Sequence, residues 1–512
     1  MKEIKSNIIP FILLGLIALA LGLISMDEGH EFGDDFALYL EQAEYIFQPS
    51  EYAKHVQQNT ECMKVSDAVI GPNSYPIGFP LFLKLLQSIG GTSDLRFLKI
   101  VLFAFFLFAA TRLTFEYVKN MPNRGIGILT CALIVFSPKV IEASDRLLSD
   151  LLFSAFVFLF FAEIKTYKDN FKSDIFLLFW LLCAQITRPT GILLAISLIV
   201  FWWFRNSNRT KFGYRVISLV FVLFLVRWTQ GGGDSIYMSV LKSGISVESI
   251  RDNLLYYSAL MVKLPFWNYL KIADQAVPIF SLVVGMLFAV LFVWVLIYDF
   301  FKSYTQERVF LVLHLTILLA WPSLQGVRLL FPVFPIYMIL LIHYLSGRVG
   351  GWINLKFKKP IVSLLVLLCF IQGFATAIHY YKTDTNQAFS VEMRELSQFI
   401  ARKVDKNTYI SFFKPRLLRY QTHNRAVRVQ NSVDYSSPSL KLNKSVHRDS
   451  LLRKGIGYYV APRFDYDNLR DEKVNKKNFL TELSDDIVIF QNKQFVVFKL
   501  KELDEQVKSN QQ

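Results

Sequence analysis

Two consecutive carboxylates, Asp34 and Asp35, follow Gly33 shortly after the first apolar segment of the chain. Tyr39 and Ala43 stand four and eight residues beyond Asp35, so a helix at this point would present all three on one face. A carboxylate can act as a general base in proton transfer. Acidic residues at the start of a helix also stabilise it simply through its dipole. The spacing alone leaves both roles open.

A second segment of interest spans 74–81 and has the sequence SYPIGFPL. Its prolines and glycine predict a turn that leads into an apolar helix. Taken by itself, this segment is a structural corner that carries one polar aromatic side chain, Tyr75.

Three arginines, Arg146, Arg188 and Arg328, stand beside apolar segments. A guanidinium group holds a phosphate through paired donors, which a lysine ammonium group does not reproduce. Arginine near the end of a membrane span also extends its charge to the surface without any ligand. Both explanations apply to each arginine taken singly. Lys84 and Lys139 are weaker candidates of the same kind.

The elements that must position these residues follow from composition. The chain has 512 residues, of which 53% are hydrophobic and 19% are charged, against about 25% charged in a soluble domain. Uncharged apolar runs such as 8–25 and 278–298 have the length of membrane spans. A soluble enzyme, a disordered chain and a nucleic-acid-binding protein are therefore excluded. The net charge of +15 fits basic cytoplasmic loops, because lysine and arginine gather there.

The apolar runs predict an α-helical polytopic membrane protein with about 11 transmembrane helices. We place them near 8–25, 97–117, 125–141, 147–163, 174–187, 189–204, 214–229, 277–298, 308–322, 328–346 and 360–380. Alternate short connections are basic, which predicts a cytoplasmic N-terminus and, with an odd number of spans, an extracytoplasmic C-terminal region. The pair over 174–204 is also compatible with one short hairpin around Arg188 and Pro189. A change in the number of spans by one would reverse the predicted side of the C-terminal region.

This topology places Arg146, Arg188 and Arg328 at the outer ends of spans. Two of the three adjoin turns that contain proline. Three guanidinium groups on one face favour an anionic lipid headgroup as their partner over three independent surface anchors.

We predict two domains. A transmembrane domain covers 1–384 and includes a long first outer loop over 26–95, and a small soluble α/β domain covers 385–512. The stretch 230–276 is predicted to be a further polar loop. In the soluble domain, apolar spacing predicts a helix over 391–404, and short β-rich runs predict strands over 409–413 and 457–460. A hairpin is predicted over 487–500, with an asparagine-containing turn.

The sequence shows no metal-binding pattern. Four cysteines have no C-x-x-C spacing, and His30 beside Glu31 is too small a set to form a site. We expect no tightly bound metal and no other cofactor, although the sequence leaves a divalent metal open.

Together, these motifs resemble the GT-C glycosyltransferases, in particular the branch of the protein O-mannosyltransferases and the lipid A aminoarabinose transferases. The resemblance rests on the order of its segments over about 1–345. They are the acidic pair with Tyr39, the YPIGFPL segment, an outer loop over 144–150 with the sequence SDRLLSD, the turn RPTG at 188–191, and RLLFPVFP at 328–335. The acidic pair of this family is often Asp-Glu, whereas here it is Asp34-Asp35, and the spacing to Tyr39 selects Asp35 as the matching position.

The resemblance implies transfer of a sugar from a polyprenyl phosphate to an acceptor hydroxyl by direct, inverting displacement. Phosphate is a good leaving group, so one carboxylate base suffices, whereas a glycosidase requires two opposed carboxyl groups. It implies Asp35 as the base, with Asp34 or Asp150 as an orienting or sugar-binding group. Tyr39 and Tyr75 are the implied neighbours in the substrate site, and the arginines at 146, 188 and 328 are expected to hold the phosphate.

Two other readings stay open: a lipid or sugar transporter or flippase, and a ligase or polymerase of surface polysaccharide. Transporters usually carry polar groups at mid-membrane in two related halves, whereas these carboxylates follow a span. We expect an integral protein of a bacterial inner or plasma membrane whose partners are a polyprenyl-phosphate sugar donor, membrane lipids and an acceptor lipid, glycan or protein. Nucleic acid is not an expected partner, and neither the sugar nor the acceptor can be inferred from motifs.

Overall fold

The computed structural model describes residues 2–66, 72–92, 94–119, 124–205, 209–229, 247–276, 305–321, 326–349, 355–383, 386–429, 450–462 and 487–500, with a few single residues between 283 and 297. The chain divides into two compact units. The first, which we call the helical unit, comprises 1–28 and 76–384; the second, the mixed unit, comprises 29–75 and 385–512. Residues of the long first outer loop therefore group with the C-terminal segment.

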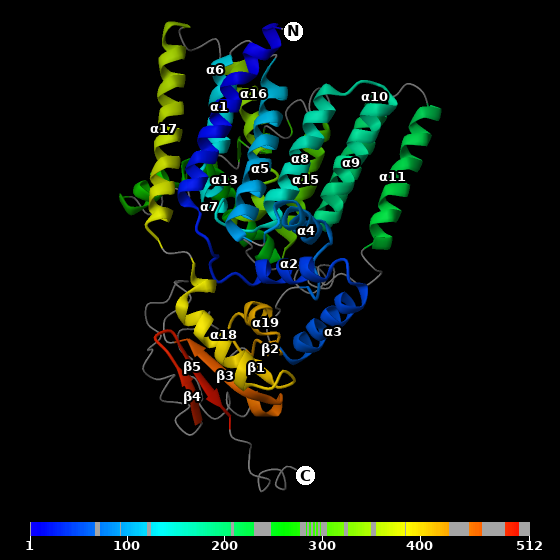
Figure 1. Cartoon of the computed structure of the whole chain (residues 1–512). Coiled ribbons are helices and arrows are strands. Elements are labelled where there is room, and N and C mark those ends of the chain that lie inside the picture. The colour runs from blue at the N-terminus through cyan, green and yellow to red at the C-terminus, as the bar shows by residue number, and fades with distance from the viewer. Residues whose placement is uncertain are drawn as a thin grey trace. The chain divides into compact units, whose positions relative to one another are not determined.

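The helical unit consists of helices and short 3-10 turns (Figure 1). In chain order these are α1 (Lys2–Ser25), α4 (Gly78–Gly90), α5 (Leu95–Val118), α6 (Arg124–Val135), α7 (Pro138–Ala143), α8 (Ser149–Thr166), α9 (Phe171–Thr187), η1 (Pro189–Gly191), α10 (Ile192–Arg205), α11 (Arg209–Thr229), α13 (Val247–Ala276), α15 (Thr305–Ala320), η2 (Val327–Leu330), α16 (Phe334–Val349) and α17 (Leu355–Tyr381).

Ten of the predicted spans coincide with described helices or with helix pairs, and most of the eleventh, 277–298, lies outside the described residues. Within the described part, three segments are long and apolar enough to cross a membrane: Ile8–Ser25, Leu95–Val118 and Pro360–Tyr381. The total of eleven spans remains a prediction. The pair over 174–204 is formed by α9 and α10, which are joined by the turn η1.

The centre of the helical unit is formed by α5 and α8, which pack along each other. Phe106 of α5 is fully buried and contacts Phe158 of α8 and Phe331, with ring centroids 5.7 Å and 6.4 Å away. Helix α9 packs along α8 and has α11 on another side (Figure 1), whereas α10 packs mainly against α15.

The helix α13 differs from the prediction of a polar loop over 230–276. Its first turns carry charged residues, among them Arg251 and Asp252, so no uncharged run marks it in the sequence. Pro265 interrupts the helix, and Phe266 has non-helical angles of φ −130° and ψ 27°. A proline within a helix removes one backbone hydrogen bond and kinks the axis. Ser137 donates to the carbonyl of Leu264 at 2.7 Å, which satisfies one acceptor at the kink.

The mixed unit contains a sheet with strand order β2-β1-β3-β5-β4. Its elements are α2 (Asp34–Tyr45), α3 (Pro49–Val65), η3 (Gln387–Phe389), α18 (Val391–Lys403), β1 (Tyr409–Ser411), α19 (Pro415–Thr422), β2 (Ala426–Val427), β3 (Ile456–Pro462), β4 (Ile487–Gln491) and β5 (Phe495–Lys499). Strand β1 pairs in parallel with β2 and β3, whereas β5 pairs antiparallel with β3 and β4. The predicted helix, both predicted strands and the predicted hairpin are confirmed.

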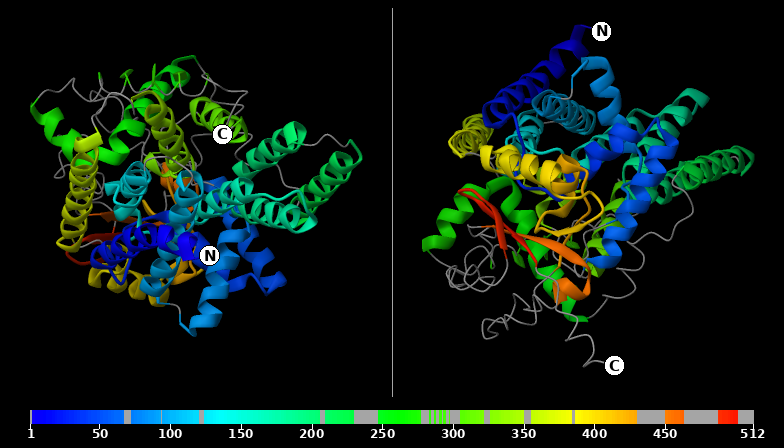
Figure 2. Two further views of the ribbon diagram at one scale, coloured as in Figure 1. Left: turned by 90° about the horizontal axis from the view of Figure 1, so that it is seen from above. Right: turned by 60° about the horizontal axis from the view of Figure 1, so that its bottom comes forward.

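Helix α18 forms where the sequence provides both a cap and an apolar stripe. The side chain of Ser390 accepts a hydrogen bond from the backbone N–H of Met393, which caps the helix start. Met393, Leu396 and Ile400 are fully buried at helical spacing. The helix lies along one face of the sheet (Figure 1 and Figure 2).

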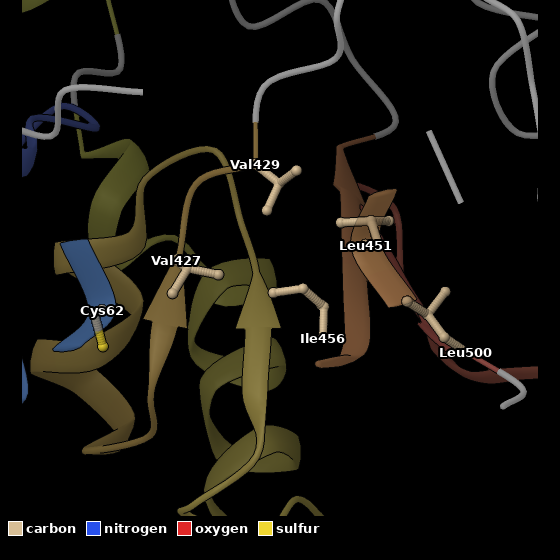
Figure 3. Packing of buried hydrophobic residues seen from close by; sticks show 6 residues of the cluster. All are labelled: Cys62, Val427, Val429, Leu451, Ile456 and Leu500. Atoms are coloured by element: carbon tan, nitrogen blue, oxygen red, sulfur yellow. The ribbon is translucent and has the colours of Figure 1, made fainter. Parts of the chain in front are cut away.

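A hydrophobic cluster joins the early segment to the C-terminal segment within the mixed unit (Figure 3). Cys62 of α3 is buried in one cluster with Val427, Ile456 and Leu500. The cysteine therefore behaves as a small apolar side chain, and burial raises the pKa of its thiol. Packing of this kind explains why 29–75 belongs with 385–512 although more than 300 residues separate them.

Candidate functional site

The carboxylate of Asp35 lies in a polar cluster of the mixed unit, on the first turn of α2. The Tyr75 hydroxyl donates a hydrogen bond of 2.6 Å to Asp35 Oδ1. The rings of Tyr39 and Tyr75 are in contact, with centroids 4.4 Å apart. The structure thus brings together Asp35, Tyr39 and Tyr75, three of the residues that the sequence selected. Asp34 is the first residue of α2, and its side chain lies outside the described part of the structure.

The position of Tyr75 is set by Gln42, which is fully buried one helical turn beyond Tyr39. The Gln42 side chain accepts from the backbone N–H of Tyr75 at 2.9 Å and donates to the carbonyl of Tyr75 at 3.1 Å. The side-chain amide of Gln42 therefore pairs with both the backbone N–H and the backbone carbonyl of Tyr75. These two hydrogen bonds hold Tyr75 against the polar face of α2.

Arg416 completes this cluster and was not selected from the sequence. Its Nη1 lies 3.1 Å from the Tyr75 hydroxyl and 3.5 Å from Asp35 Oδ1, and its Nη2 donates to the carbonyl of Pro72 at 2.7 Å. The arginine side chain is 4% exposed, whereas that of Asp35 is 29% exposed. The carboxylate is therefore anchored on one side and accessible to solvent on the other.

A second ion cluster links α2 and α19, the helices that carry Asp35 and Arg416, with α3. Glu41 of α2 lies 3.5 Å from Arg419 of α19 and 3.2 Å from His55 of α3, and all three side chains are buried. Burial would raise the pKa of the Glu41 carboxyl, but Arg419 and His55 outweigh it and hold that pKa below its usual value. Arg416 and Arg419 stand three residues apart in α19 and therefore share one face of the helix. This spacing is the sequence signal that could have identified both arginines as candidate site residues.

The helical unit contains a cavity of about 370 Å³. The arginines Arg146 and Arg328 line it, together with Lys139, Glu142 and the rings of Tyr256 and Trp267. The Lys139 ammonium group lies 4.2 Å from the centroid of the Trp267 ring, a cation–π contact. Cationic groups and aromatic faces therefore meet in one concave site, which suits an anion attached to an organic group.

Three of the charged lining residues come from one short stretch of chain around α7. Lys139 and Glu142 are three residues apart and lie within 2.5 Å of each other, and Arg146 donates to Glu142 at 3.1 Å from four residues further on. Burial alone would raise the pKa of the Glu142 carboxyl. The positive charges of Arg146 and Lys139 lower this pKa by more than burial raises it, so it lies below the usual value. Glu142 is therefore ionised at neutral pH.

Two further lining residues of the cavity, Arg328 and Trp267, each follow a backbone segment of unusual conformation. Gly326 has φ 75°, a left-handed conformation that favours glycine, and directly precedes the turn η2 that carries Arg328. Trp267 follows the kink of α13 at Pro265 and Phe266. The structure places the ring of Trp267 in the wall of the cavity.

Asp150 and Arg188 are paired with each other and are not among the residues that line the cavity. Asp150 lies in the first turn of α8 with a side chain that is 1% exposed, and Arg188 follows the end of α9. A nearby pair, Lys99 and Asp145, is also buried, and its charged atoms are 2.7 Å apart. Both pairs join segments of the helical unit.

Other candidates take ordinary positions. Lys84 lies in α4, outside the lining of the cavity. His30 stacks on Phe36 and is hydrogen-bonded to the carbonyl of Glu31. Among the residues that the structure describes, no group of three or more histidine, cysteine or acidic side chains is arranged to hold a metal ion.

Sequence comparison and structure comparison give different results for this chain. No family model matches it, and no curated protein matches it by sequence. Its structure, however, is similar to that of ArnT from Cupriavidus metallidurans in the apo state, with a TM-score of 0.55 over 96% of this chain and 97% of that one, at 12% identity. A second structure of ArnT, bound to undecaprenyl phosphate, has a TM-score of 0.51 over 96% and 98% of the two chains, also at 12% identity.

Two larger proteins show the same likeness. The oligosaccharyltransferase of Archaeoglobus fulgidus, solved tethered to an acceptor peptide, has a TM-score of 0.55 over 89% of this chain and 69% of that one, at 9% identity. The arabinofuranosyltransferase AftD from Mycobacteria has a TM-score of 0.51 over 96% and 40%, at 12% identity. All of these are GT-C glycosyltransferases. The chain therefore has the fold of that superfamily, and the expected resemblance to it is confirmed.

Proposed function

We propose that the protein is a membrane glycosyltransferase that moves a sugar from a polyprenyl-phosphate donor to an acceptor hydroxyl at the outer face of a membrane. The observation that carries the proposal is the cavity of the helical unit, in which Arg146, Arg328 and Lys139 meet aromatic side chains, in a chain with a GT-C fold. Structures of this fold have been solved with undecaprenyl phosphate and with dolichol phosphate. A lipid-linked phosphate has the charge and the apolar portion that such a cavity accommodates.

In the proposed reaction, the acceptor oxygen attacks the anomeric carbon as the bond between that carbon and the phosphate oxygen breaks. Asp35 takes the acceptor proton, and the polyprenyl phosphate leaves with the bonding electrons. Arg146 and Arg328 balance the charge that the departing phosphate gains. The configuration at the anomeric carbon inverts, because no covalent intermediate between sugar and protein is formed.

The neighbours of Asp35 fit the role of a base. Tyr75 donates to Oδ1 of Asp35, and Arg416 lies 3.1 Å from the Tyr75 hydroxyl and 3.5 Å from the same carboxylate oxygen, so these two side chains hold the carboxylate in place. Tyr39, in contact with the ring of Tyr75, is proposed to contact the acceptor or the sugar. Asp34 is proposed to assist in binding, and Asp150 to act through Arg188, its partner in the ion pair.

The proposal needs no metal, because arginine side chains carry the phosphate charge. A zinc ion is present in one structure of the Archaeoglobus fulgidus oligosaccharyltransferase, so the point requires a test. We expect turnover by the purified protein to survive removal of divalent cations by a chelator. Loss of turnover that is restored by adding back zinc, magnesium or manganese would show that a metal takes part.

The function is tested by mass spectrometry of lipid-linked sugars and surface glycans from cells with and without the gene. We expect deletion to remove one glycan modification and to raise the amount of one polyprenyl-phosphate sugar. Wild-type protein should restore the modification, and the Asp35→Asn variant, expressed at an equal level, should not. Restoration by the variant would exclude the proposed base chemistry and would favour a transporter.

A further inference from the structure

We propose that His314 of α15 is a positioning residue, whose ring holds the turn η2 in the place from which Arg328 lines the cavity. The inference rests on the proposed function, since it concerns how one ligand of the donor phosphate is held. His314 takes no part in the proposed reaction and is not among the described residues that line the cavity.

The turn that carries Arg328 is short and has little support of its own. It spans four residues, Val327–Leu330, and hydrogen bonds in a 3-10 turn have poorer geometry than those of an α-helix. The backbone N–H of Phe331 donates to the carbonyl of Arg328 at 3.3 Å. Gly326 precedes the turn with φ 75°, and glycine restrains the backbone less than any other residue. The turn by itself therefore fixes the direction of the Arg328 side chain only weakly.

His314 supplies support from another helix. Its Nε2 lies 3.1 Å from the carbonyl oxygen of Leu329, the residue after Arg328. A carbonyl oxygen only accepts, so Nε2 carries the proton and donates. The His314 ring is 4% exposed and lies 5.5 Å from the ring of Phe310, which in turn lies 5.4 Å from the ring of Phe161 in α8. The hydrogen bond therefore ties the turn to the centre of the helical unit.

The second nitrogen of the ring argues against a role in packing alone. Nδ1 of His314 is buried and has no hydrogen-bond partner among the residues that the structure describes. A buried polar atom without a partner lowers stability, and an ionisable side chain inside a predicted span, here 308–322, adds a further cost. An apolar side chain would fill the same place without either cost. The hydrogen bond to the turn that carries Arg328 accounts for a histidine at this position.

The test is a double-mutant cycle between His314 and Arg328, measured as the dissociation constant of undecaprenyl phosphate for the purified full-length protein in detergent. His314→Leu removes the donor and is expected to weaken binding by about three- to tenfold, which corresponds to one hydrogen bond. In the Arg328→Ala background the same change is expected to have no further effect, because the side chain that the turn presents is gone. An equal loss in both backgrounds would overturn the inference.

Two further variants and a control separate the hydrogen bond from packing. His314→Gln can place an amide N–H where Nε2 stands and should bind nearly as wild type does. His314→Asn can place it only where Nδ1 stands and should bind as weakly as His314→Leu. Leu177→Ala removes buried volume from another helix, α9, and should lower the melting temperature without changing the affinity. If Leu177→Ala loses as much affinity as His314→Leu, the inference is wrong.

The failure of the inference and that of the proposed function give different results. If His314→Leu binds the lipid as tightly as wild type while Arg328→Ala binds it weakly, the proposed function stands and His314 positions nothing. If wild type itself does not bind undecaprenyl phosphate, the proposed function fails and the inference fails with it.

Discussion

The Tyr75 hydroxyl donates a 2.6 Å hydrogen bond to Oδ1 of Asp35, although 40 residues separate the two in the sequence. Arg416 contacts both residues from a helix in the C-terminal segment. Two donors thus converge near one accessible carboxylate. A carboxylate used only to start a helix needs no such partners, so this arrangement favours a functional role for Asp35 over the dipole alone.

We predict that Asp35→Asn lowers turnover by about 10²–10⁴-fold, because the amide keeps the shape of the side chain but cannot accept the acceptor proton. Binding of undecaprenyl phosphate should be unchanged. The measurement is sugar transfer at saturating donor. Asp34→Asn is the matched control and should cost less. An inactive Asp34→Asn beside an active Asp35→Asn would assign the base to the other member of the pair.

We predict that Arg146→Ala and Arg328→Ala each weaken binding of undecaprenyl phosphate by about 10- to 100-fold, the size of one charge-assisted hydrogen bond. Arg→Lys should also be harmful, because a point charge does not replace a paired donor. Isothermal titration in detergent measures the effect. Arg96→Ala is the control, since Arg96 is exposed and does not line the cavity. If both cavity variants bind undecaprenyl phosphate as tightly as wild type does, Arg146 and Arg328 are surface anchors and not ligands of the phosphate.

We predict that Arg188→Ala destabilises the protein by about 3–5 kcal/mol, because it leaves the buried carboxylate of Asp150 without its guanidinium partner. The double variant Arg188→Met with Asp150→Leu should recover most of the loss. Thermal unfolding monitored by intrinsic fluorescence provides the comparison. A stable Arg188→Ala protein that no longer binds undecaprenyl phosphate would instead make Arg188 a ligand of the phosphate.

We predict an acid-dependent loss of stability that originates at Glu41. Its pKa in the folded protein lies below the ordinary value of 4.5. The ionised side chain therefore contributes stability that is fully present above about pH 4.5 and is lost as the pH falls through the folded pKa. Melting temperatures of wild type and Glu41→Gln, measured between pH 6 and about pH 3, should converge toward acid. A constant difference between the two would contradict the prediction.

We predict that the N-terminus is cytoplasmic and that the mixed unit's C-terminal segment is outside. On a background without native cysteines, a membrane-impermeant maleimide should label Lys406→Cys in intact cells. Lys168→Cys, an equally exposed position in a loop predicted to be cytoplasmic, should be labelled only after permeabilisation. The reverse pattern would invert the topology, and with it the proposed outer location of the reaction.

Much of the local structure follows from the sequence alone. Uncharged runs mark the helices of the helical unit, and apolar spacing marks α18, because the periodicity of buried residues is a local property of the chain. The hairpin over 487–500 is equally local. The resemblance to a known family, and not periodicity, selected Asp35, Tyr39 and Tyr75, which the structure brings together.

The partners of those residues were decided only by tertiary structure. Arg416 reaches Asp35 across 381 residues, and no local pattern encodes a pairing at that separation. Helix α13 escaped prediction because charged residues break its apolar run, and its kink places Trp267 beside Lys139. The pairing of Asp150 with Arg188 likewise depends on how α8 and α9 pack. Residue types set which chemistry is available here, and long-range packing decides which charges stand together.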